Sequence, residues 1–444
     1  MNKLIWMTAV AIAVAATANA QTASTDATQK MLDRLDTLEK QNAQLLDEIR
    51  QLRQEVKERQ VQQSEANDRI EDRVAVTETR IDEHTQTKLS SSQRFPISLT
   101  GMFLFDASLS YGPRNPIFES TYQDETLGPR GGDATLRQSI IGFEFHGPKL
   151  PGDGQVHGSL AMDFYANNGN ADLFRIRRGV VSFDWKRRSI AFGQEKPLIS
   201  PLQPTSFARV GVPPLAGAGN LWLWLPQVRY EERMPFSAAT QASLSGALIE
   251  TDEEYSGATL PPQASLQSYR PGFEARGEIK HTWSYDSRFV LGFGGHVSST
   301  HLNGGSVPSR LVSMDLDYKP LRWIGFSGTI VHGENFSNLG GIPPGVTING
   351  VSVTPVHGTA GWVQVALPVT SQLTFDAYAG RQLNRATDLS AFQIVRSLTY
   401  AANALYKIAP NVVLGIEAAQ DRIDYLNHTA FKTNRYDLTA AYLF

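Results

Sequence analysis

The residues with the clearest chemical potential form a short alternating stretch, Phe174-Arg175-Ile176-Arg177. A period of two is the spacing of a β-strand, in which successive side chains point to opposite faces. The two arginines therefore share one face of the strand. A guanidinium group offers a permanent charge and a planar fork of donors suited to a carboxylate or a phosphate. The stretch predicts an anion-facing strand, and Arg178, which breaks the alternation, predicts a bulge or a strand end.

Two later segments also place charged residues on one face of a strand. Residues 227–231 contribute Arg229 and Glu231, and residues 274–280 contribute Arg276 and Lys280. Rows of opposite charge can pair across neighbouring strands and stiffen a sheet, whereas rings of Arg or Lys around a pore favour anions. Both interpretations are open from the sequence. The second makes Arg175, Arg177, Arg229, Glu231, Arg276 and Lys280 the lining and selectivity residues of a channel.

Other kinds of chemistry find little support in the sequence. The chain has no cysteine, which excludes a disulfide framework and a thiolate metal site. An enzyme within a barrel would need a nucleophile and a base on neighbouring strands, but no motif surrounds any of the nine histidines. Basic and acidic residues are equal in number from Ser91 onward, so no overall field steers ions or nucleic acid. We predict no catalytic residue, no metal and no cofactor.

The charged strands belong to a predicted meander of sixteen antiparallel strands between Ile97 and Phe444. Most have one apolar and one polar face, as in the first strand, where Phe103 and Phe105 oppose Thr100 and Asp106. Their connections alternate between long and short, with 195–224 and 301–308 among the long ones. Outer-membrane barrels combine short periplasmic turns with longer external loops and an even strand number. The pattern predicts an all-β transmembrane barrel, wide enough at sixteen strands for an aqueous channel.

The last predicted strand, 432–444, carries the strongest girdle signal. Tyr436, Tyr442 and Phe444 share one face, and the chain stops on the aromatic residue. Tyrosine and phenylalanine at strand ends are typical of the aromatic girdle at a membrane interface. Trp222 and Trp224 have the parity of lipid-facing residues in the strand that follows, so we also assign them to the girdle. The preceding loop is rich in proline, and the sequence leaves open whether it folds into the pore.

Two further segments precede the barrel. Residues 1–20 have a basic residue, a short apolar run and an Ala-x-Ala site, which predicts a signal peptide. Residues 21–94 contain a heptad pattern with apolar residues at the a and d positions, typical of a periplasmic coiled coil that oligomerises. The predicted oligomerisation residues are Leu35, Leu38, Asn42, Leu45, Ile49, Leu52 and Val56. A single amphipathic helix or a charged, partly disordered segment is the alternative. The barrel domain occupies 95–444.

Short motifs along the mature chain resemble a known family. They are Leu136-Arg137-Gln138-Ser139, Phe174-Arg175-Ile176-Arg177-Arg178, Phe192-Gly193-Gln194 and Pro226-Gln227-Val228-Arg229-Tyr230. Together with the coiled coil and the terminal Phe444, they resemble the trimeric DcaP-like outer-membrane porins, and more distantly the phosphate-selective porins O and P. Ile140 departs from the pattern, because these porins tend to carry another lumenal arginine there.

The resemblance implies a trimer in the bacterial outer membrane that takes up small hydrophilic, anionic solutes such as dicarboxylates. The departure at Ile140 weakens the expectation of strong anion selectivity. β-Branched a and leucine d residues favour two strands in a coiled coil, whereas the resemblance implies three, so this number is open. A barrel that only anchors the coiled coil as an envelope tether is the alternative function. The sequence does not identify the solute.

Overall fold

A computed structural model describes residues 97–112, 130–168, 171–251, 271–302, 305–350 and 352–444. The signal peptide, the coiled coil and its seven oligomerisation residues lie outside the described residues. Nineteen strands are described. They are β1 (Ile97–Tyr111), β2 (Arg130–Thr135), β3 (Ile140–Leu150), β4 (Gly154–Asn168), β5 (Ala171–Asp184), β6 (Arg188–Glu195), β7 (Leu225–Pro235), β8 (Thr240–Ile249), β9 (Gly272–Ser284), β10 (Ser287–Leu302), β11 (Gly305–Leu321), β12 (Ile324–Glu334), β13 (Val346–Asn349), β14 (Ser352–Pro355), β15 (His357–Pro368), β16 (Leu373–Asn384), β17 (Ile394–Ala409), β18 (Val412–Tyr425) and β19 (Phe431–Leu443).

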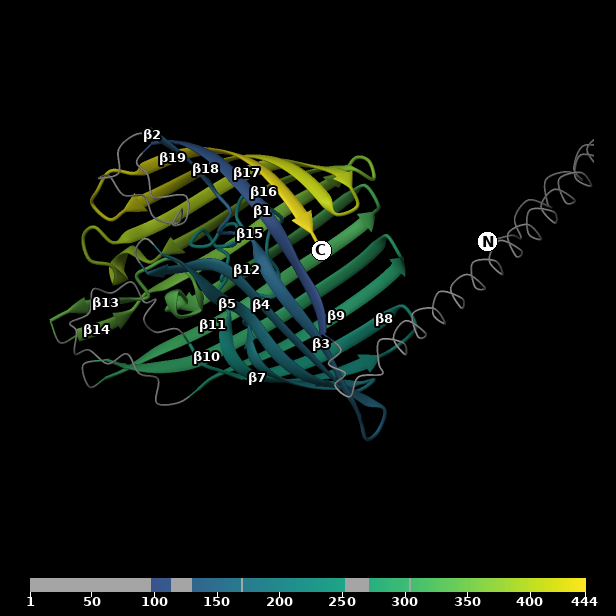
Figure 1. The fold of residues 1–444 in the computed structure, drawn as a ribbon. Coiled ribbons are helices and arrows are strands. Elements are labelled where there is room, and N and C mark those ends of the chain that lie inside the picture. The colour runs from purple at the N-terminus through teal and green to yellow at the C-terminus, as the bar shows by residue number, and fades with distance from the viewer. Residues whose placement is uncertain (1–96, 113–129, 169–170, 252–270, 303–304, 351) are drawn as a thin grey trace, which may run out of the picture. The chain divides into compact units, whose positions relative to one another are not determined.

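Seventeen of these strands form one closed antiparallel barrel (Figure 1). Most of these strands pair with their neighbours in sequence, β12 pairs with β15, and β19 pairs with β1 to close the wall. β2 and β3 both pair with β1, one above the other, so together they occupy a single place in the wall. The barrel is therefore sixteen strands around, which confirms the predicted number. The sequence pattern predicts one continuous strand over residues 134–147 at this place, and the structure instead interrupts it at residues 136–139.

The connections follow the predicted alternation with some corrections. The short turns are 151–153, 185–187, 236–239, 285–286, 322–323, 369–372 and 410–411. The predicted long loop 301–308 is wrong, because β10 and β11 continue to Leu302 and from Gly305. Their extra residues pair with each other and lengthen the hairpin. The loop between β12 and β15 contains the 3₁₀ helix η4 (Phe336–Leu339) and the hairpin β13–β14, and the next loop contains η5 (Ala386–Asp388).

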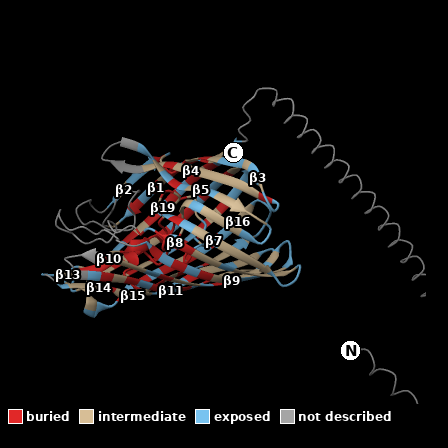
Figure 2. Ribbon diagram, turned by 90° about the horizontal axis from the view of Figure 1, so that it is seen from below, coloured by how far each residue is buried: buried red, intermediate tan, exposed pale blue. Residues whose placement is uncertain are grey.

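Buried and exposed residues alternate along most strands of the wall (Figure 2). Along β1, Phe103 and Phe105 are exposed on the outside, whereas Leu104 and Asp106 are buried inside. The same alternation runs through β19, where Tyr436 and Leu438 point outward and Arg435 and Asp437 inward. An outward apolar face and a polar interior are the pattern of outer-membrane barrels. No helix in the described ranges has the length and apolar character of a membrane span.

The interior also contains apolar clusters, which the strand pattern did not predict. They form where residues 196–224, between β6 and β7, pack against the inner wall. Ile199, Leu221 and Leu223 pack with residues of β8, β11, β12 and η4. Leu215 and Ala218 pack against Trp362 of β15 and Tyr378 of β16. The segment 196–224 therefore lies inside the barrel, which answers the question that the sequence left open.

Candidate pore and its constriction

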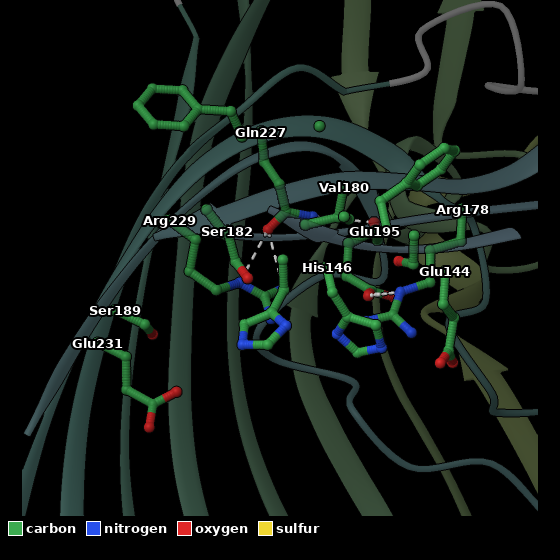
Figure 3. A pocket seen from close by; sticks show the side chains of 17 residues that line it. Glu144, His146, Arg178, Val180, Ser182, Ser189, Glu195, Gln227, Arg229 and Glu231 are labelled. Carbon is green, nitrogen blue, oxygen red and sulfur yellow. Dashed lines mark hydrogen bonds and ion pairs between the residues drawn. The ribbon is translucent and has the colours of Figure 1, made fainter. Parts of the chain in front are cut away.

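A cavity of about 330 Å³ lies against the inner wall formed by β3–β7 (Figure 3). Inward-facing polar side chains of five adjacent strands surround it: Glu144, His146, His157, Ser159, Arg178, Ser182, Ser189, Glu195, Gln227, Arg229 and Glu231. Arg178 forms an ion pair with Glu195 at 2.5 Å, and Arg229 donates to Gln227. The cavity therefore has a polar lining that a small hydrophilic solute can contact.

The basic side of the lumen is centred on Asp163 of β4, whose carboxylate is fully buried. Arg175 donates to both of its oxygens, with Nη2 at 2.6 Å from Oδ2, and Arg177 reaches Oδ2 at 3.4 Å. The Arg177 guanidinium also lies 4.5 Å from the ring centroid of Trp224. Two cations that share one buried carboxylate leave a local positive excess. We call Asp163, Arg175 and Arg177 the arginine pair site.

A bulge in β5 explains how Arg175, Arg177 and Arg178 all reach this region. In the pairing of β4 with β5, Ala161 lies opposite Arg178 and Met162 opposite Ile176, which leaves Arg177 as an extra residue. A bulge bends the strand and redirects a side chain. Arg177 therefore reaches Asp163 from a position outside the regular alternation, as the broken parity at Arg178 predicted. The carboxylate that pairs with Arg175 and Arg177 is Asp163, whereas Glu231 pairs with Arg233 at 3.5 Å.

Residues 196–224 contact the wall at several places around the lumen, including β5, β8, β11 and β15. On the basic side, Arg175 Nη2 donates to the Gly211 carbonyl at 2.6 Å. The side-chain oxygen of Gln138, Oε1, accepts hydrogen bonds from the backbone N–H groups of Val210 and Gly211, at 2.7 and 2.8 Å. Gln138 lies in the interruption between β2 and β3, outside any regular strand. The broken strand thereby supplies a clamp for the loop.

The acidic side of the lumen is formed by β1, β18 and β19. Arg435 lies between Glu417, at 3.0 Å, and Asp437, at 2.7 Å. The loop adds Arg209, which pairs with Asp421 at 3.3 Å, and Ser206, whose hydroxyl donates to Glu417. Asp106, also buried here, accepts from Gln138 at 2.9 Å. The carboxylates on this side are Asp106, Glu417, Asp421 and Asp437, and the cations are Arg209 and Arg435; we call these six residues the carboxylate site.

The remaining predicted lining residues also face inward, but they differ in surroundings. Arg229 donates to the Lys196 carbonyl at 2.7 Å, so it supports the start of the loop. Arg276 is buried and pairs with Asp315 and Glu278. Lys280 is exposed near the turn end of β9, with no ion pair among the described residues. Arg276 is thus held between carboxylates of the wall, whereas Lys280 is accessible.

Lys196 is the first residue of the loop, directly after β6. Burial lowers the pKa of its amine to about 8; the Glu195 carboxylate opposes this shift, and the Arg177 guanidinium adds to it. Its amine donates to Gln203 at 2.5 Å. Because a lysine with a pKa of about 8 loses its charge just above neutral pH, Lys196 makes the charge of this region depend on pH.

The assignment of Trp222 and Trp224 to a membrane girdle is wrong. Trp222 is 5% exposed and packs in the interior with the loop and η4. Trp224 contacts the same cluster and stacks with the lumenal arginines. The prediction extended the alternation of β7 back to these residues, but the strand begins only at Leu225. Tyr436, Tyr442 and Phe444 are exposed on the outer face, and their role in a girdle stays a prediction.

One histidine has the neighbours of a catalytic base. His296 Nδ1 lies 3.0 Å from Glu274 Oε1, and its Nε2 lies 2.9 Å from Ser298 Oγ. However, His296 and Glu274 are buried, and Glu274 accepts the N–H of Leu198 with its second oxygen. We interpret this group as an anchor for the loop. Within the described ranges, no three His, Cys, Asp or Glu side chains are placed to hold a metal ion.

Sequence reasoning missed several of the residues that shape the lumen. Asp163 was detectable, because it alternates with apolar Met162 and Phe164 in a predicted strand. Glu417 and Asp437 carried the same signal in β18 and β19. Arg209 carried none, and Gln138 stood only within a motif of the family resemblance, because the roles of both depend on the path of the loop through the barrel. Ile140 faces the lumen beside Val210, where it packs in an apolar cluster.

The closed sixteen-stranded wall with an inserted loop defines the fold of outer-membrane porins. Among solved structures, the outer-membrane channel DcaP of Acinetobacter baumannii is similar, with a TM-score of 0.67 and 19% identity over 80% of this chain and 99% of that one. OmpT of Vibrio cholerae gives a TM-score of 0.48 with 10% identity over 80% and 99%. No family model matches the sequence, and no curated protein matches it. The predicted likeness to DcaP is confirmed for the fold.

Proposed function

We propose that this chain is an outer-membrane porin, through which small hydrophilic solutes diffuse passively. The observation that carries the proposal is the closed barrel with an apolar outside, a polar inside and an inserted loop. The outside suits lipid, since the wall closes through the pairing of β19 with β1 and is not an open sheet. The polar cavity beside β3–β7 supports a water-filled path.

We infer further that the channel prefers anions mildly, with small dicarboxylates as the solute class implied by the family resemblance. The support is the excess of arginine around Asp163, where Arg175 keeps 24% of its side chain exposed. Arg178 and Arg229 extend this positive surface along the cavity. Glu144, Glu195 and Glu231 line the same cavity and oppose the preference, which is why we expect it to be mild.

We also infer that the chain assembles as a trimer through the predicted periplasmic coiled coil in residues 21–94. The heptad pattern supports oligomerisation, and the number three comes from the family resemblance. Native mass measurement of the full chain, and of a variant without residues 29–90, tests this assembly. A trimer that persists unchanged in the shortened chain would contradict the role of the coiled coil.

Planar-bilayer recording of the purified full chain tests the porin function. We expect stepwise conductance in potassium chloride and, in a salt gradient, a reversal potential displaced slightly toward the anion. Larger organic anions of the dicarboxylate class should reduce the chloride current by competing for the pore. A barrel that is folded by circular dichroism but gives no conductance steps would overturn the proposal and favour the envelope anchor.

A further inference from the structure

The outer face of the barrel carries a group of cations near the loop ends of β16–β19. Strand pairing places Arg381 beside Leu398, Leu398 beside Arg422, and Arg422 beside Lys432. Arg396 shares this outward face, two residues from Leu398 toward the loops. Neighbouring strands lie about 4.8 Å apart, so these side chains lie within reach of one ligand. We call Arg381, Arg396, Arg422 and Lys432 the outer cation row.

The outer cation row has an excess of positive charge. One carboxylate, Asp424, lies among the four cations, and it pairs with both Arg396 and Arg422. Arg381 and Lys432 are exposed, and neither forms an ion pair or a side-chain hydrogen bond with the described part of the chain. Cations on the lipid side of a barrel are unfavourable unless they meet an anionic group or the interface. Two of the four cations therefore have no anionic partner within the described part of the chain.

The neighbouring rows of side chains place these cations at one depth. One step toward the turns, Tyr400 donates to Gln420, and Gln420 donates to Asn434. Tyr111 lies opposite Asn434 and packs against Tyr436. Outward tyrosines followed by aliphatic residues are typical of the boundary between headgroups and hydrocarbon. The outer cation row lies just beyond this boundary on the loop side, at the depth of lipid headgroups.

An apolar hollow of about 390 Å³ adjoins the row on the outer wall of β12–β17. Two small residues leave this space open. Gly361 of β15 lies opposite Arg381 of β16, and Ala379 of β16 lies opposite Val363 of β15. The other outward residues around the hollow are Ile330, Thr359, Val363, Leu383 and Leu398. A depression of this kind accommodates a hydrocarbon chain whose polar end meets the arginine.

We propose that this surface binds a phosphate-bearing lipid of the outer leaflet, with one acyl chain in the hollow and its phosphate on the outer cation row. A guanidinium group binds phosphate through two parallel hydrogen bonds, which suits Arg381. The inference rests on the proposed membrane location. A second copy of the chain fits less well, because the nearby outward carboxylates Glu334, Asp388 and Asp424 already pair within this chain.

Native mass spectrometry of the full chain in neutral detergent tests the proposal, with diphosphorylated lipid A as the probe. Variant R381A/R422A/K432A removes three charges from the row. The matched control K186A/R188A/R322A removes three exposed charges from the turn end of the barrel. Because each Lys or Arg adds to the attraction of an anionic lipid surface, we expect the first variant to bind the probe at least tenfold more weakly. The control should bind it as the parent does.

A second variant, A379F, fills the hollow and leaves the charges in place. It should weaken binding of diphosphorylated lipid A several-fold, and millimolar inorganic phosphate should not displace the lipid from the parent chain. Equal binding by the parent and R381A/R422A/K432A, or an equal loss in the control, would overturn the proposal. A lost oligomer with unchanged lipid binding would instead assign the surface to a second copy. Conductance is measured for each variant, so absent conductance in all of them counts against the porin function alone.

Discussion

The arginine pair site and the carboxylate site differ in charge and in access, although the same loop touches both. At the first, Arg175 and Arg177 share one carboxylate. At the second, four carboxylates surround two arginines. The two imbalances have opposite signs, with one cation in excess at the first site and two carboxylates in excess at the second. A barrel without a large net charge can therefore hold local regions of opposite charge, since the field depends on where the charges lie.

Access decides which of the two sites a passing ion meets. Arg175 exposes 24% of its side chain, whereas Arg435 exposes 5% because it lies between Glu417 and Asp437. Charges in contact with water act on solutes directly, and buried charges act mainly on their neighbours. The arginine pair site should thus govern selectivity, and the carboxylate site should mainly hold the loop.

The largest effect is expected from removing both arginines in R175A/R177A. Asp163 would keep its burial and lose both cations, which costs about 3–5 kcal/mol for a buried charge without a partner. The reversal potential should also move toward cations. Thermal unfolding and bilayer recording measure the two effects.

The control R175A/R177A/D163N removes the unpaired carboxylate as well. It should recover most of the lost stability and still have less anion preference than the parent. If its selectivity equals that of the parent, the arginines serve only as partners of Asp163 in the wall.

A smaller effect is expected from Q138A, which removes the clamp between the loop and the wall. The N–H groups of Val210 and Gly211 would lose their acceptor, and each unsatisfied buried group costs about 1–3 kcal/mol. We expect faster hydrogen exchange at residues 208–211 and larger current fluctuations. Exchange unchanged from the parent would mean that Arg175 alone holds the loop at Gly211.

Neutralising the carboxylate site in E417Q/D437N should have a weaker effect on selectivity. Both amides can still accept from Arg435, so we expect the fold to persist. The reversal potential should move toward anions by less than R175A/R177A moves it toward cations. A shift of equal or greater size, measured in the same salt gradient, would contradict the difference in access between the two sites.

The smallest effect is expected from pH, through Lys196. Its amine, with a pKa of about 8, is charged below that pH and neutral above it. Raising the pH from 7 to 9 therefore removes one positive charge near the arginine pair site, and the reversal potential should move toward cations. In K196R the charge stays over this range, so the shift should disappear. A shift that persists in K196R belongs to another group.

Much of the wall was predictable from the sequence, because a period of two is a local signal. Strand number, closure through β19 and the inward direction of Arg175, Arg229 and Arg276 all followed from alternation and loop length. The errors came at strand ends. Trp222 and Trp224 were assigned by extending the alternation of β7 to residues before Leu225. In the hairpin β10–β11, both strands were predicted to stop too early at the loop end.

The interior of the lumen was not predictable in the same way. Residues 196–224 have no period, and their contacts join positions up to 212 residues apart, as in the pair of Arg209 with Asp421. Such pairs depend on the path of the loop through a closed barrel. The interruption at residues 136–139 also has no signal of its own until Gln138 is seen to hold that loop.

The bulge at Arg177 has a consequence for how this chain can change in length. Loss of one residue from a regular strand turns every following side chain to the opposite face. At the bulge, Ile176 and Arg178 already lie opposite consecutive residues of β4. A deletion of Arg177 would join them in regular alternation and leave both faces of the barrel as they are. Among descendants of this sequence, a single-residue gap can thus arise here inside a membrane strand, in a place where insertions and deletions are otherwise confined to loops.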